Sequence, residues 1–116
     1  MNNIDSKLKF LTIYRSCSDD AQKINLLIST GSKKFENFFK NLSFEFELFF
    51  DLIKLLITNI GEDCHSDLAS ILKFIFENKR NKLNFKMIQK KEKRFLLEAL
   101  KKGDEQLFEV YQNYLK

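Results

Sequence analysis

The chain has 116 residues, 44% hydrophobic and 31% charged, with a formal net charge of +4. This length and composition exclude a disordered chain and fit one globular domain, residues 1–116. The sequence has no Pro and only 3 Gly, and no useful stretch alternates apolar with polar residues. We therefore expect an all-α fold in which short turns join the helices.

A first helix is expected over about residues 5–15. Leu8, Leu11 and Tyr14 recur there at helical spacing and would form its inner face. Residues 16–18 are polar or small and break the pattern. The first helix should therefore end before the second begins.

The second helix should begin after Ser18 or Asp19. Asp19 and Gln22 are three residues apart, which is the spacing of a capping box. Gly31 follows the last apolar position and is a natural stop, because Gly adopts the left-handed conformation that often ends a helix. Ser32 is expected to cap a short third helix.

The segment Ser43–Ile60 predicts the central helix of the fold. Its polar residues after the first turn are spaced four, three and four apart and would form one narrow stripe, Glu47, Asp51, Lys54 and Thr58. Nearly every other position in the segment is apolar. A helix that is apolar on three sides must be surrounded by neighbouring helices. We therefore expect the other helices to pack around this one, which should end at Gly61.

A polar loop, residues 62–65, should separate the central helix from a fifth helix that begins at Ser66 or Asp67. This helix carries apolar residues at helical spacing up to Phe76. Residues 78–84 then form the most polar segment of the chain, and we interpret them as a linker.

The remainder of the chain predicts two or three further helical segments. Residues 85–88 form a short helical turn or the start of the helix that continues through residues 91–101. Gly103 and Asp104 have the order of a helix stop followed by a cap. Residues 107–115 carry the apolar positions of the last helix. The fold class is thus a compact all-α bundle, or a short superhelical array, of about six to seven helices.

Few residues have the pattern of a metal or nucleophilic site. Asp63, Cys64 and His65 are adjacent in sequence, but the only other cysteine is Cys17 and a zinc site needs three or four protein ligands. We interpret the cluster as a loop and helix cap, and both cysteines as free thiols of a reducing compartment. No catalytic, cofactor-binding or metal-binding residue is predicted.

Charge is distributed unevenly along the chain. Ten basic residues lie between Lys79 and Lys102, opposed there only by Glu92 and Glu98, whereas residues 45–67 are mostly acidic. Such asymmetry creates a dipolar field that favours a charged partner. Nucleic acid is one candidate, because neutralising phosphates drives binding. The modest net charge and the lack of a nucleic-acid recognition motif favour an acidic patch on a protein instead.

The series of helices resembles the C-terminal helical domain of the RNA polymerase II-associated cochaperone adaptor family, which is also found in a sperm-associated antigen and in a coiled-coil dynein-arm assembly factor. The resemblance covers nearly the whole chain through weak apolar motifs. They are Phe10 with Tyr14, DAQKINLL from Asp20, FENFFKNL from Phe35, LIKLL from Leu52, LASIL from Leu68, KKEKRFLLEAL from Lys90, and Leu107 with Phe108. The Arg-Phe step of the family corresponds either to Asn84-Phe85 or to Arg94-Phe95.

The resemblance implies a non-enzymatic adaptor that docks on a RuvB-like AAA+ ATPase and supports chaperone-assisted assembly of large complexes such as RNA polymerases or axonemal dyneins. From charge alone we predict that Lys90, Lys91, Lys93 and Arg94 contribute to that docking. The expected location is the cytoplasm, with the nucleus or a cilium as alternatives. The N-terminus lacks the pattern of a secretory signal, and the acidic and basic residues in the longest apolar stretch exclude a membrane span.

Two alternatives come from other functional classes. The chain could be a small basic helical nucleic-acid-binding protein, whose binding would fall steeply with salt. It could also be a structural component of an axoneme, which would copurify with microtubules. The adaptor is the function we expect.

Overall fold

The computed structural model describes residues 6–42, 44–61 and 66–116, which form helices and no strands. The expected all-α fold is confirmed. The helices in chain order are α1 (Lys7–Ser16), α2 (Asp20–Thr30), α3 (Ser32–Phe39), α4 (Phe46–Thr58), α5 (Ser66–Glu77), the 3₁₀ helix η1 (Lys79–Asn81), α6 (Lys82–Met87), α7 (Lys90–Gly103), α8 (Glu105–Tyr111) and the 3₁₀ helix η2 (Gln112–Leu115).

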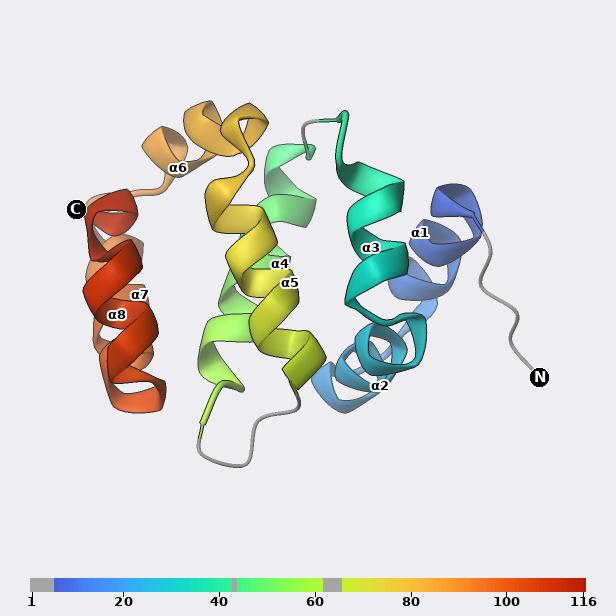
Figure 1. The fold of residues 1–116 in the computed structure, drawn as a ribbon, viewed down its shortest axis with the longest axis horizontal. Coiled ribbons are helices and arrows are strands. Elements are labelled where there is room, and N and C mark those ends of the chain that lie inside the picture. The colour runs from blue at the N-terminus through green and yellow to red at the C-terminus, as the bar shows by residue number, and fades with distance from the viewer. Residues whose placement is uncertain (1–5, 43, 62–65) are drawn as a thin grey trace.

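Two helices, α4 and α5, occupy the middle of the molecule (Figure 1). Helices α1, α2 and α3 lie on one side of them, and α7 and α8 lie on the other. α4 packs against α5, α6 and α7, whereas α5 packs against α2, α3, α4 and η1. The two central helices thus link the N-terminal and the C-terminal helices in a body that measures 39 × 30 × 24 Å.

The predicted burial of the central helix is confirmed, although its bounds differ. α4 begins at Phe46 and ends at Thr58, and Ser43 lies outside the described residues. Of the polar stripe, Glu47, Lys54 and Thr58 are exposed and Asp51 is half-buried. Most of the apolar surface is buried against the neighbours, with the enclosed positions at Phe49, Leu52, Ile53, Leu55, Leu56 and Ile57. Phe46, Leu48 and Phe50 in the first turns are half-buried.

The centre of the fold is shared between α4 and α5, whereas the sequence predicted a single central helix. α5 buries Leu68, Ile71, Leu72, Ile75 and Phe76. Its exposed positions, such as Lys73, are too few to separate it from the core. α5 is therefore central because it has packed neighbours on several sides, although its apolar stripe is narrower than that of α4.

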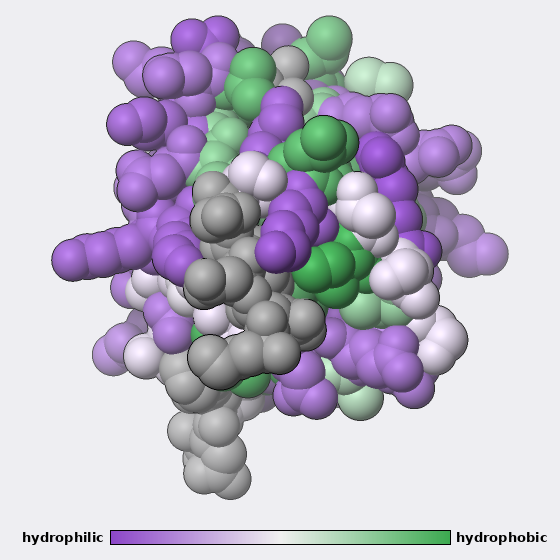
Figure 2. Space-filling view, turned by 90° about the vertical axis from the view of Figure 1, so that its right-hand side faces the viewer, coloured by the Kyte–Doolittle hydropathy of each residue, from purple (hydrophilic) through white to green (hydrophobic). Residues whose placement is uncertain are grey.

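Phe10, rather than Leu8, defines the inner face of α1. Phe10 is fully buried, whereas Leu8 is 74% exposed. Residues two apart on a helix point to nearly opposite sides, so only one of them can face the core. The Phe10 ring lies 5.7 Å from the Phe35 ring and 5.9 Å from the Phe39 ring of α3, measured between centroids. On the face that α1, α2 and α3 present, hydrophobic residues form smaller areas among hydrophilic ones (Figure 2).

The predicted caps at Asp19, Gly31 and Asp104 are confirmed. The Asp19 carboxylate accepts from the backbone N–H of Gln22 at 2.8 Å, and Gly31 ends α2 with a φ of 84°. Asp104 ends α7 and accepts from the first N–H groups of α8. In the capping box the Gln22 side chain accepts from the N–H of Ser18 at 2.7 Å rather than from that of Asp19.

The prediction that Ser32 caps α3 is wrong. Ser32 is the first residue of that helix, and no side chain of the preceding residue caps it. The backbone N–H of Ser32 instead donates to the carboxylate of Asp67 in α5 at 3.1 Å. The cap is therefore supplied by a residue distant in sequence, which also ties α3 to α5.

The segment that we interpreted as a polar linker, residues 78–84, is helical and partly buried. Asn81 is fully enclosed and Asn84 is 8% exposed. The amide of Asn81 donates to the carbonyl of Ile75 at 3.1 Å, and the amide of Asn84 donates to the carbonyl of Phe44 at 2.9 Å. These hydrogen bonds fix η1 and α6 against the core. α6 is separate from α7, so the described residues form eight α-helices rather than six or seven.

Gly103 marks a close approach between the end of α7 and the chain that leaves α4. A Cβ atom at Gly103 would lie 2.5 Å from both the side chain and the carbonyl oxygen of Ile60. We predict that Gly103→Ala lowers the free energy of unfolding by about 1–3 kcal/mol, because a backbone atom cannot move aside without disturbing the core. Gly61→Ala is the matched control, since a Cβ there meets nothing within 4 Å. Urea denaturation of both variants measures the difference, and equal stabilities would contradict the prediction.

Candidate functional site

The four residues predicted to contribute to docking lie in the first turns of α7 but do not share one surface. Lys90, Lys91 and Arg94 are exposed, whereas Lys93 is half-buried. Lys93 lines a hollow that also receives residues from the C-terminal end of the chain. The structure therefore separates Lys93 from the other three and places it in a different setting.

That hollow, which we call the lysine groove, lies where α5, η1, α6, α7 and the end of the chain meet. Its volume is about 670 Å³. It is lined by Phe76, Glu77, Asn78, Lys79, Lys82, Phe85, Lys86, Lys93, Asn113, Tyr114 and Lys116. The local fold brings these residues together because the buried asparagines Asn81 and Asn84 hold η1 and α6 against α5 and α4.

Aromatic rings form the floor of the lysine groove. The Phe76 and Phe85 rings are stacked with centroids 5.3 Å apart, and Phe76 also stacks on Tyr111 at 4.6 Å. Tyr114 lies 5.5 Å from Phe76 and 5.4 Å from Phe85, with its ring tilted against both. Tyr114 is 42% exposed and Phe76 only 1%, so the groove is apolar at its base and opens to solvent through Tyr114.

Positive charge surrounds this aromatic floor. Lys79, Lys82, Lys86, Lys93 and Lys116 line the groove, and none of them forms an ion pair within the part of the chain that the structure describes. The one lining carboxylate, Glu77, accepts a short hydrogen bond from the Tyr111 hydroxyl. The lysine groove therefore carries a net positive charge that the described residues do not neutralise.

A second hollow continues the basic surface toward α3. It shares Glu77, Asn78 and Lys79 with the lysine groove. Its other lining residues are Glu36, Lys40, Ser70, Lys73, Phe74 and Arg80. Together the linings of the two hollows hold eight basic and two acidic residues.

Sequence reasoning identified part of this surface and missed the rest. Lys79, Lys82, Lys86 and Lys93 belong to the basic segment noted in the sequence. Lys116 and the aromatic floor were not connected with it, because their proximity depends on how the last helices fold back. The sequence signal for them is the spacing of Tyr111 and Tyr114 among the apolar positions of the last helix.

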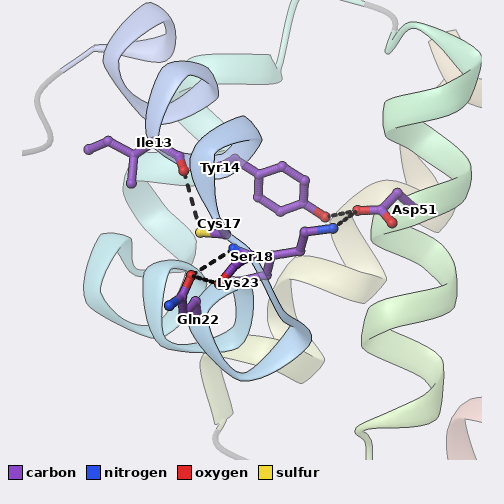
Figure 3. A network of polar contacts seen from close by, with 7 residues as sticks. All are labelled: Ile13, Tyr14, Cys17, Ser18, Gln22, Lys23 and Asp51. Carbon is purple, nitrogen blue, oxygen red and sulfur yellow. Dashed lines mark hydrogen bonds and ion pairs between the residues drawn. The ribbon is translucent and has the colours of Figure 1, made fainter.

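A separate polar network joins α1, α2 and α4 (Figure 3). The Tyr14 hydroxyl donates a short hydrogen bond to the Asp51 carboxylate, and the Lys23 ammonium lies 3.1 Å from the same oxygen. The Lys23 ammonium also lies 5.2 Å from the centroid of the Tyr14 ring. Burial raises the pKa of Tyr14 well above its ordinary value of 10.0, and the hydrogen bond to Asp51 raises it further. This network anchors the N-terminal helices to the polar stripe of α4.

The cysteine and metal-site candidates considered from the sequence lie only partly within the described residues. Cys17 is a half-buried free thiol that donates to the carbonyl of Ile13 at 3.3 Å. Within residues 6–42, 44–61 and 66–116, no group of three or more His, Cys, Asp and Glu side chains could hold a metal ion. Asp63, Cys64 and His65 lie outside the described residues. None of the helices in the described segments is both long and apolar enough to cross a bilayer.

Comparison with known proteins identifies most of the chain. A family model described as the potential Monad-binding region of RPAP3 matches residues 3–93. The match covers α1 to α6 and the start of α7, and η2 lies beyond it. Comparisons with curated proteins and with solved structures gave no match.

The raised pKa values of two buried tyrosines predict how stability depends on alkaline pH. Burial raises the pKa of Tyr111, as it does that of Tyr14, and the hydrogen bond to Glu77 adds to the effect. Folding therefore favours the protonated phenols. Their contribution is complete below the unfolded value of 10.0 and is lost as pH rises from there toward the folded-state pKa.

We expect the free energy of unfolding to fall as pH rises above about 10, and to fall less steeply in Tyr14→Phe/Tyr111→Phe. Urea denaturation at several pH values measures both slopes. Both chains carry the same lysines, so the difference between the two slopes reports the tyrosines and not the titration of lysine. Equal slopes would show that the two phenols are not preferentially protonated in the folded chain.

Proposed function

Because the chain belongs to the family of the potential Monad-binding region of RPAP3, we propose that it is a non-enzymatic adaptor domain that binds a protein partner. The match over residues 3–93 is the observation that carries this proposal. The family is described as a binding region, and we therefore infer that this chain also binds a protein.

We extend the proposal to docking on a RuvB-like AAA+ ATPase in the cytoplasm, in support of chaperone-assisted assembly of large complexes. Its support is the family resemblance described from the sequence. The exposed basic residues Lys90, Lys91 and Arg94 at the start of α7 would attract an acidic surface of the ring. Long-range attraction of this kind raises the rate of association more than it lengthens the lifetime of the complex.

Nucleic-acid binding is the second candidate, and its support is the five lysines that line the lysine groove, none of which forms an ion pair with another described residue. Phosphate binding to several lysines must weaken steeply as salt rises, because each neutralised phosphate releases a counterion. Gel shifts with single- and double-stranded DNA and RNA at two salt concentrations test this. A shift that disappears at the higher concentration would support nucleic acid, and the absence of any shift at low salt would exclude it.

The docking proposal predicts a kinetic effect of charge reversal. In Lys90→Glu/Lys91→Glu/Arg94→Glu, which leaves Lys93 of the lysine groove unchanged, association with a purified RuvB-like ring should slow about tenfold at low salt, because electrostatic steering is lost. Surface plasmon resonance at low and physiological salt measures the rates. The salt dependence of the association rate should also weaken in the variant.

Lys33→Glu is the matched control, because Lys33 is an exposed lysine of α3 far from α7 in the fold. It should leave the association rate within about twofold of the parent chain, since distant surface charges are screened. Unchanged rates in the α7 variant would remove Lys90, Lys91 and Arg94 from the interface. Failure of the parent chain to bind any RuvB-like ring would overturn the docking proposal itself.

A further inference from the structure

We propose that the lysine groove is the surface through which this chain holds its protein partner, and that it binds an acidic segment carrying an apolar anchor side chain. This inference rests on the proposed adaptor function and adds the surface and the chemistry of the partner. The partner is thus placed in a groove that combines positive charge with an apolar base, and not on the exposed start of α7.

The base of the groove fits an apolar side chain. Phe76 and Phe85 line the groove while being almost entirely buried, so each exposes only a small part of its ring there. Tyr114 is 42% exposed and forms one wall. A partner side chain seated against these three rings would be removed from water on several sides. Side chains that are enclosed in this way supply most of the energy of a protein interface.

The rim of the groove fits acidic residues next to that anchor. Lys82 and Lys86 are four residues apart on α6 and both line the groove. Such a pair projects from one face of a helix. Lys79 lies at the junction with the second hollow, where Lys73 and Arg80 continue the basic surface. An extended acidic chain can therefore meet positive charge beyond the groove as well as within it.

The same residues favour a peptide over a nucleic acid. The faces of Phe76 are covered by Phe85 and Tyr111, which stack on it at interplanar angles of 7° and 5°. A base needs an open ring face for stacking, and neither face of Phe76 is open. Glu77 would repel a phosphate, whereas its carboxylate has lone pairs beyond the one used by Tyr111 and can accept peptide N–H groups.

Fluorescence anisotropy with the full chain tests the proposal. The probes are two fluorescein-labelled nine-residue peptides of Asp, Glu and Ser that differ only at the central position, which is Phe in one and Ser in the other. We expect the Phe peptide to bind about tenfold more tightly or better, because only its side chain is buried against the rings. Binding of both peptides should weaken with salt.

Two variants and a control locate the binding surface. Lys82→Glu/Lys86→Glu should weaken binding of the Phe peptide by about tenfold or more, because both cations of the rim are reversed. Tyr114→Ser should reduce the preference for Phe over Ser, because one wall of the anchor pocket is lost. Lys33→Glu should change neither value. Circular dichroism and a urea midpoint near that of the parent chain establish that each variant is folded.

Equal affinity for the two peptides would overturn the proposal, as would a Lys82→Glu/Lys86→Glu chain that is folded and binds normally. Tighter binding of a single-stranded oligonucleotide, displacing the Phe peptide, would assign the groove to nucleic acid instead. The RuvB-like ring is measured separately on the same variants. If the chain binds the ring but not the peptides, the groove proposal fails and the docking proposal stands. If it binds the peptides but no ring, the docking proposal fails and the groove proposal stands.

Discussion

The burial of α4 is the constraint on which the rest of this structure depends. Six of its residues are enclosed, and the side chains that reach solvent fully belong to the narrow polar edge, with Phe46, Leu48 and Phe50 half-buried. Water must therefore be excluded from three sides of one helix, and α5, α6 and α7 do this directly. α5 in turn contacts α2 and α3, so the N-terminal helices are held through it. The narrow edge of α4 has its own partner network in Tyr14 and Lys23, which bind Asp51.

Polar groups decide how the shorter elements attach to that core. Asn81 and Asn84 donate to backbone carbonyls of Ile75 and Phe44, which are buried positions. A buried carbonyl without a donor would cost free energy. Each asparagine amide therefore satisfies a buried carbonyl and at the same time holds its own helix against the core. η1 and α6 are fixed in this way, and the lysine groove is formed because they are fixed. The groove is thus a consequence of core packing rather than of a mobile surface loop.

Local sequence was sufficient to predict the helices, several caps and the buried character of α4. These features depend on residues at most a few positions apart, such as Asp19 with Gln22 or the four-residue spacing of the α4 stripe. The family was also recognisable, because a series of weak apolar motifs in order is specific when none of them is specific alone. The polar segment 78–84 was misread because asparagine is usually exposed, and only tertiary contacts reveal its carbonyl partners.

The candidate site was predicted only in part for the same reason. Basic residues were visible in the sequence, yet Lys93 faces the groove and Lys90, Lys91 and Arg94 do not. That division depends on how α7 is rotated against α4 and on where η2 returns. Phe76 and Tyr114 are far apart in sequence and meet only in the folded chain. No local pattern contains this information.

The cap of α3 has a consequence for the order in which the chain is completed during synthesis. The N–H of Ser32 is satisfied by Asp67, which leaves the ribosome 35 residues later. Until then α3 begins with an uncapped first turn and without the α5 surface against which it packs. We therefore expect α3 to gain its cap and its α5 contacts only after residue 67 has emerged, and its first turn to be frayed in a nascent chain arrested before that point.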